Sequence, residues 1–160
     1  MGASSFPELA HPSRPVRRRL LAGLAGAALA LRAVPPAHAT PEALAAALTE
    51  TFGARPLQPG RVRIEVPQLS EDGNVVPVNL AVESPMSAED HVRAIHLFAE
   101  RNNQPRVIEF RLTPAMGLAR VSCRIRLSAS QRIQAVAEMN DGTLWTAAAE
   151  VEVTNAGCGL

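Results

Sequence analysis

The feature that most constrains the fold is an alternation of apolar and polar residues that begins near residue 60 and continues toward the C-terminus. A period of two places successive side chains on opposite faces of a β-strand. Turn-forming residues such as Asn140-Asp141-Gly142 separate the alternating runs. The seven runs span residues 62–66, 76–82, 95–99, 108–112, 121–127, 133–139 and 145–153. This pattern predicts an all-β domain, specifically an immunoglobulin-like antiparallel β-sandwich.

A short segment before the alternating region, residues 40–52, has helical rather than strand spacing. Leu44, Leu48 and Phe52 recur every four residues, which places them on one side of a helix. Gly53 follows and is a common residue at the end of a helix. We therefore expect a short N-terminal helix before the sandwich.

The first 39 residues have the features of an export signal. Arg17-Arg18-Arg19 precedes an apolar run of twelve residues, 20–31, which is shorter than the roughly 20 that a membrane span requires. Ala37-His38-Ala39 resembles a cleavage site and leaves Thr40 as the first mature residue. The consecutive arginines favour a twin-arginine signal, with an ordinary secretory signal as the alternative. Either one predicts a periplasmic protein without a permanent membrane anchor.

The charge balance argues against nucleic-acid binding. The precursor has 16 arginines, no lysine and 15 acidic residues, a formal net charge of +1. Removal of residues 1–39 takes away five arginines and one acid, which leaves 11 against 14 and a net charge of −3. A nucleic-acid-binding domain would instead carry a clustered basic excess.

The sequence contains no motif that predicts a catalytic or metal site. Nucleotide-binding loops, serine-nucleophile motifs and haem-attachment motifs are absent. His91 and His96 are five residues apart on an extended segment and should face opposite sides, so we expect no shared metal. Arg120, Arg124 and Arg126 share one face of a predicted strand. They form either a solvated surface or a contact for an anion or acidic partner.

The two cysteines occupy very different positions. Cys123 belongs to an apolar alternation and is expected to point into the core as an inert thiol. Cys158 is third from the end, between Gly157 and Gly159, in a stretch of small and polar residues. We predict that residues 154–160 form a flexible arm that ends the 40–153 sandwich domain. A disulfide with Cys123 requires Cα atoms within about 7 Å, which a buried mid-strand position disfavours.

A thiol at the end of such an arm suits a carrier better than an enzyme. No basic residue or helix N-terminus lies near Cys158 in the sequence to activate it. A thiol of this kind is a poor catalyst alone, but partner enzymes can supply the activation. The flanking glycines have no side chains to obstruct passage into narrow active-site channels.

The most distinctive stretches of this sequence are residues 82–86, 124–127, 131, 135–142, 145, 151–154 and 157–159. Together they resemble the SoxY family, the sulfur-carrying subunits of the bacterial Sox sulfur-oxidation system. In that family the C-terminal motif is Gly-Gly-Cys-Gly-Gly, whereas this chain has Ala156 and Leu160 at its first and last positions.

The resemblance implies a covalent carrier rather than a turnover enzyme. It implies that Cys158 holds the sulfur intermediate, with Gly157 and Gly159 as the flexible joint and no other cofactor. It also implies a heterodimer with a SoxZ-like subunit and transient contacts with SoxAX-, SoxB- and SoxCD-like enzymes. Two alternatives remain open at this stage. One is a periplasmic immunoglobulin-like binding or assembly module, and the other is a thiol-disulfide or peroxide-reducing enzyme.

Overall fold

The computed structural model of the protein describes residues 41–157. The predicted export signal, residues 1–39, lies outside the described residues, and so do Cys158 and Gly159. The route of export and the state of these two arm residues therefore remain predictions. No helix in the described part of the chain is long and apolar enough to cross a membrane.

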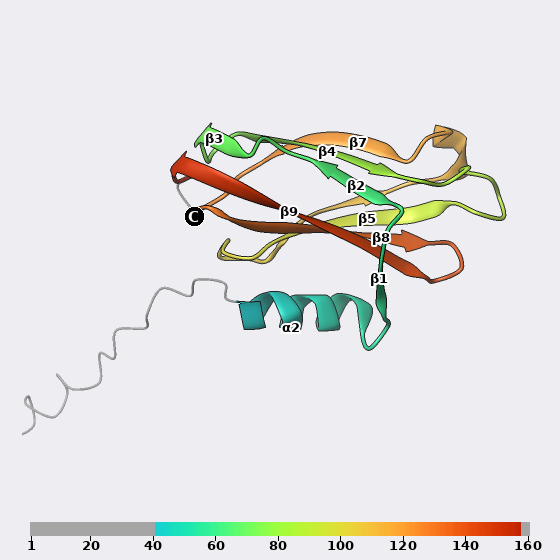
Figure 1. Ribbon diagram of the computed structural model, residues 1–160. Coiled ribbons are helices and arrows are strands. Elements are labelled where there is room, and N and C mark those ends of the chain that lie inside the picture. Colours follow the sequence, from blue (N-terminus) through green and yellow to red (C-terminus); the bar gives the residue numbers. More distant parts are fainter. Residues whose placement is uncertain (1–40, 158–160) are drawn as a thin grey trace, which may run out of the picture. The chain divides into compact units, whose positions relative to one another are not determined.

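Two β-sheets lie face to face, and the α-helix α2 covers the outer side of the larger one (Figure 1). The larger sheet has the strand order β1-β9-β8-β5-β6, with β3 also paired to β9, and the smaller has the order β2-β4-β7. The elements are α2 (Pro41–Phe52), β1 (Leu57–Pro59), β2 (Val62–Glu65), β3 (Leu69–Asp72), β4 (Val76–Val82), β5 (Val92–Ala99), β6 (Arg106–Arg111), the 3-10 helix η2 (Pro114–Met116), β7 (Arg120–Ile125), β8 (Gln131–Met139) and β9 (Leu144–Asn155).

The predicted β-sandwich is confirmed, and each of the seven alternating runs contains a strand. The structure adds β1 and β3, which the sequence did not reveal. These strands have only three and four residues, too few to show a period of two. Both strands pair in parallel with β9. The larger sheet is therefore mixed, whereas the sequence predicted antiparallel pairing throughout.

The main core lies between the two sheets. Along β4, Val76, Val78 and Leu80 are at most 1% exposed and alternate with exposed residues. Ile95 and Leu97 of β5 belong to the same buried cluster from the opposite sheet. Complete burial of each such side chain contributes roughly 1.5–3 kcal/mol to stability, so these alternating positions dominate the fold.

A second buried cluster holds α2 on the outer face of the larger sheet. Phe52 packs there with Phe98 and Leu144, and Leu44 and Leu48 lie partly buried beside them. The predicted apolar side of the helix is therefore the side that packs. The helix ends as expected at Gly53, whose φ of 67° is in the left-handed region and whose N–H donates to the Thr49 carbonyl at 2.7 Å.

His96 is buried in the interface between α2 and the sheet. Its ring lies edge-on to Phe52, with centroids 5.0 Å apart, and neither ring nitrogen has a hydrogen-bond partner. Its Nδ1 is 3.9 Å from a carboxylate oxygen of Glu109, which is beyond hydrogen-bond distance. Burial lowers the pKa of His96, and the carboxylates of Glu109 and Glu138 only partly oppose this effect. The imidazole is therefore neutral in the folded protein near pH 7.

We expect this histidine to make the folded protein less stable in acid. Because the pKa of His96 is lowered in the folded state, the unfolded chain binds its proton more readily, and the free energy of unfolding decreases as the pH falls below about 6.5. A His96→Leu variant removes this contribution. Urea unfolding of both proteins between pH 8 and pH 5 should show the variant gaining stability relative to the wild type as the pH falls. A constant difference over that range would contradict this account.

Candidate functional site

The last strand extends further toward the C-terminus than the sequence suggested. β9 continues to Asn155, two residues beyond the predicted end of the sandwich at Val153. The side chains of Thr154 and Asn155 donate hydrogen bonds to the Glu71 carbonyl at 3.2 and 3.0 Å. β9 therefore extends into the segment predicted as the arm, because β3 provides a partner strand for these residues.

Gly157 is also packed against the sandwich rather than free. It is buried, and its N–H donates to the Leu127 carbonyl at 3.0 Å. The Leu127 N–H donates to the Gly73 carbonyl at 2.8 Å, and the Gly73 N–H donates to the Asn155 carbonyl at 2.8 Å. We call the meeting point of Gly73, Leu127 and Gly157 the glycine junction. In the structure Gly157 therefore packs against the body of the sandwich at this junction, and its predicted role in a flexible joint stays a prediction.

Cys123 points inward from β7, as predicted, but is only half-buried. It lies opposite Val78 in the smaller sheet, between the inward-facing side chains of Val121 and Ile125. The incomplete burial follows from its position on β7, an edge strand of the smaller sheet. Burial still raises the pKa of this thiol, which makes it less reactive.

The two histidines lie in different surroundings. The His91 Nδ1–H donates to the Ser87 carbonyl of its own loop at 3.0 Å, whereas His96 is enclosed beneath α2. Within residues 41–157, no group of three or more His, Cys, Asp or Glu side chains could hold a metal ion.

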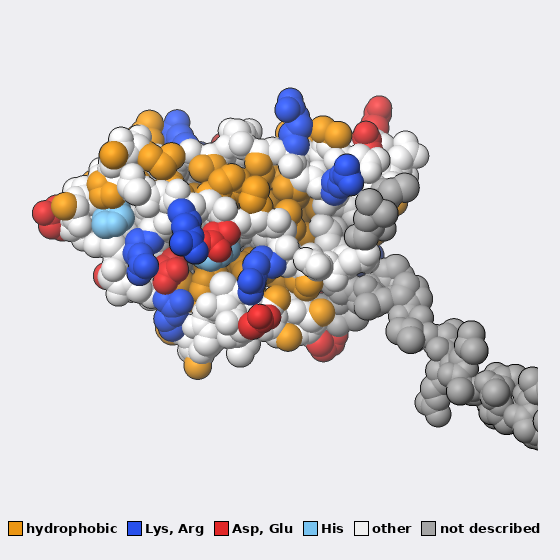
Figure 2. Space-filling model, turned by 180° about the vertical axis from the view of Figure 1, so that it is seen from behind, with side chains coloured by type: hydrophobic (Ala, Val, Ile, Leu, Met, Phe, Trp, Pro, Cys, Tyr) orange, Lys and Arg blue, Asp and Glu red, His pale blue; other side chains and the backbone are white. Residues whose placement is uncertain are grey.

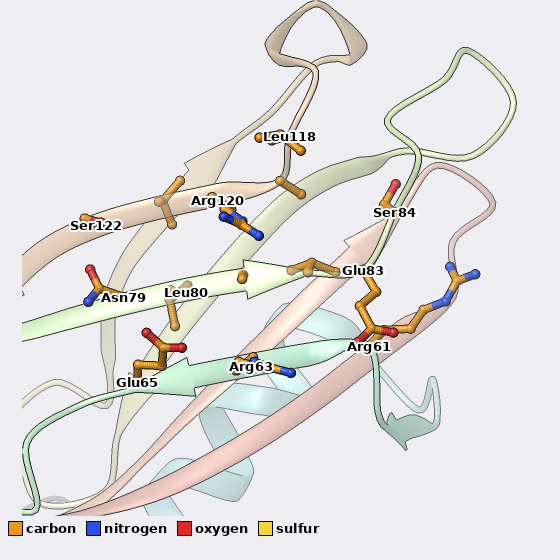
Figure 3. A pocket seen from close by; sticks show the side chains of 14 residues that line it. Arg61, Arg63, Glu65, Asn79, Leu80, Glu83, Ser84, Leu118, Arg120 and Ser122 are labelled. Atoms are coloured by element: carbon orange, nitrogen blue, oxygen red, sulfur yellow. The ribbon is translucent and has the colours of Figure 1, made fainter.

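An open hollow of about 560 Å³ lies on the outer face of the smaller sheet (Figure 3). Arg63 of β2 and Arg120 of β7 flank Ala81 in register, so the small alanine forms part of the floor between two guanidinium groups. Glu65 and Glu83 also line the hollow. The lining thus carries both charges, with Arg61, Arg63 and Arg120 beside the two glutamates. Arg120 thus belongs to a mixed polar surface.

Seen from behind the view of Figure 1, the surface shows hydrophobic side chains among charged ones (Figure 2). The edge strands β6 and β7 carry partly buried apolar residues that pack against the core between the sheets. These residues are Val107, Ile108, Phe110 and Val121.

Comparison with solved structures identifies the class of fold. Superoxide reductase (neelaredoxin) from Ignicoccus hospitalis is 20% identical, with a TM-score of 0.53 over 76% of this chain and 99% of that chain. A putative superoxide reductase from Thermotoga maritima is 20% identical, with a TM-score of 0.50 over 61% and 87%. At this identity the likeness shows the fold alone, which is a neelaredoxin-like β-sandwich.

A second comparison identifies the family. The sulfur carrier protein SoxY from Chlorobium limicola f thiosulfatophilum is 31% identical, with a TM-score of 0.59 over 71% of this chain and 97% of that chain. The family model for the sulfur oxidation protein SoxY matches residues 48–158. The chain belongs to the SoxY family, which confirms the resemblance seen in the sequence. No curated protein matches the chain significantly.

The half-burial of Cys123 predicts a mild effect of its replacement. A Cys123→Ser substitution puts a hydroxyl beside apolar neighbours, but water can still reach part of the site. We expect a loss of about 1 kcal/mol in the free energy of unfolding, at the low end of the cost of an unsatisfied buried polar group. Urea denaturation measures this loss. A cost of about 3 kcal/mol or more would show that the residue is in effect fully buried.

Proposed function

We propose that this protein is a periplasmic sulfur carrier that holds thiosulfate-derived sulfur covalently on Cys158 and presents it to partner enzymes. Membership of the SoxY family carries this proposal, because the matched segment extends to residue 158. The chain contains one other thiol, Cys123, and burial makes that thiol less reactive. The arginine-rich segment at residues 17–19 supports export by the twin-arginine route.

The proposed chemistry joins two sulfur atoms and then releases sulfate. In the first step, the Cys158 thiol and thiosulfate lose two electrons and one proton and form a Cys–S–S–SO₃⁻ adduct. A haem enzyme of the SoxAX type accepts the electrons. In the second step, water cleaves the bond between sulfur and the sulfonate group, which leaves as hydrogen sulfate, and a persulfide remains on the cysteine. A SoxB-type hydrolase catalyses this step, and in some systems a SoxCD-type enzyme oxidises the remaining sulfur.

The described scaffold supports a carrier rather than a turnover enzyme. His96 is enclosed and has no hydrogen-bond partner, so it cannot act as a base on a substrate at the surface. Cys123 faces the interior of the sandwich. A carrier needs no catalytic pocket of its own, because its partners surround the bound group during each reaction.

Replacement of the proposed attachment residue should abolish function without affecting the fold. In a system reconstituted with the other Sox components, Cys158→Ser should remove thiosulfate-dependent electron transfer, because a hydroxyl cannot form the sulfur–sulfur bond. Cys123→Ser is the matched control and should retain the activity. Full activity of the Cys158→Ser protein would refute the proposed function.

We also expect a stable complex with a SoxZ-like subunit. β6 and β7 end their sheets, and their half-buried side chains, including Ile108 and Phe110, leave apolar surface available for a partner. Size-exclusion chromatography with light scattering should show a one-to-one complex when the two proteins are mixed. Separate elution of two monomers at micromolar concentrations would contradict this expectation.

A further inference from the structure

The glycine junction leaves no room for a side chain at either of its glycines. A Cβ atom on Gly157 would lie 2.7 Å from the Gly73 carbonyl oxygen and 2.9 Å from that of Leu127. A Cβ atom on Gly73 would overlap the Gly157 nitrogen and lie 2.6 Å from the Leu127 oxygen. All these atoms belong to the backbone, so the clash cannot be relieved by rotation of a side chain.

Space, and not backbone conformation, makes glycine necessary at these positions. The described glycines with positive φ are Gly53, Gly60, Gly117 and Gly142, and neither junction glycine is among them. An alanine at residue 73 or 157 could therefore adopt the local backbone angles. The added methyl group would instead force the C-terminal segment away from the β3–β4 turn.

The junction joins parts of the chain that are far apart in sequence. Gly73 lies between β3 and β4, Leu127 follows β7, and Gly157 follows β9. The junction thus joins the segment after β7 of the smaller sheet to the segment after β9 of the larger sheet. It lies immediately before Cys158, the proposed sulfur-carrying residue. The Cα of Cys158 is one residue from Gly157, a separation of about 3.8 Å by covalent geometry.

From these contacts we propose that Gly73 and Gly157 are positioning residues for Cys158. The closed junction fixes the point at which the arm leaves the sandwich. The distance that the Cys158 thiol can reach is then set only by the chain that follows Gly157. Release of the junction and of the end of β9 would free the five residue steps from Val153 to Cys158, an extended reach of roughly 17 Å. Gly157 is thus the fixed end of the arm, and Gly73 is the residue of the sandwich against which it packs. This inference rests on the proposed function only in assigning the sulfur to Cys158.

The test compares the reactivity of Cys158 toward two thiol reagents, one small and one bulky, in the reduced full-length protein. Iodoacetamide is the small reagent and a maleimide coupled to a large polymer is the bulky one, with modification of Cys158 followed by peptide mass spectrometry. Opening the junction should raise the bulky-to-small rate ratio by about threefold or more in Gly73→Ala and Gly157→Ala. Gly159→Ala adds the same methyl group on the other side of Cys158 and should keep the wild-type ratio.

Hydrogen exchange provides a second readout at the junction itself. The Gly157 amide should be protected in the wild type and should exchange about tenfold faster or more in Gly73→Ala, which alters no residue of the arm. If Gly73→Ala does not fold, Gly157→Ala decides the question, because its change lies beyond the last strand. An unprotected Gly157 amide in the wild type, or wild-type rate ratios in folded junction variants, would overturn the proposal.

These outcomes are separate from those of the proposed function. An active Cys158→Ser protein would refute sulfur carriage but leave the junction intact. Unaltered exchange and reactivity in the junction variants would refute the positioning role but leave sulfur carriage intact.

Discussion

The pairing of β9 with its neighbours is the interaction on which the rest of the structure depends. This twelve-residue strand pairs antiparallel with β8 along most of its length and parallel with β1 and β3 near its two ends. Leu144, at its start, packs in the cluster beneath α2, and Val151, near its end, packs in the core between the sheets. One strand thus anchors the helix, completes the larger sheet and brings the C-terminal segment to the body.

Most of the fold could be predicted because the main sandwich follows local patterning. The alternation from Val76 to Val82, for example, corresponds directly to the buried and exposed sides of β4. The apolar side of α2, formed by Leu44, Leu48 and Phe52, could likewise be predicted from the spacing of these residues. Both patterns arise from burial of one face of a regular element, which a single sequence records.

The features that prediction missed depend on contacts between distant segments. β3 has one buried residue, Ser70, and forms only because β9 lies parallel to it. The small residues around Gly157 predict a flexible arm, and nothing in them indicates that the backbones of Gly73 and Leu127, more than 25 residues away, contact this glycine. A glycine required for close packing and a glycine required for mobility look the same in sequence. Only the coordinates of the other two segments distinguish them.

The protein divides into a scaffold and a chemical group. The described scaffold keeps Cys123 facing inward and His96 enclosed, which leaves Cys158 as the residue to which the proposed chemistry is assigned. Fixing the chain up to Gly157 suits this division, because a partner enzyme then meets the carried group at a defined place on the body.

The most direct measurement is intact and peptide mass spectrometry of the protein purified from thiosulfate-oxidising cells without reducing agent. The account predicts masses increased by a thiosulfonate or by one or more sulfur atoms, located on the peptide that contains Cys158 and removed by a thiol reductant. An unmodified C-terminal peptide during active thiosulfate oxidation, or sulfur adducts located on Cys123 instead, would contradict it.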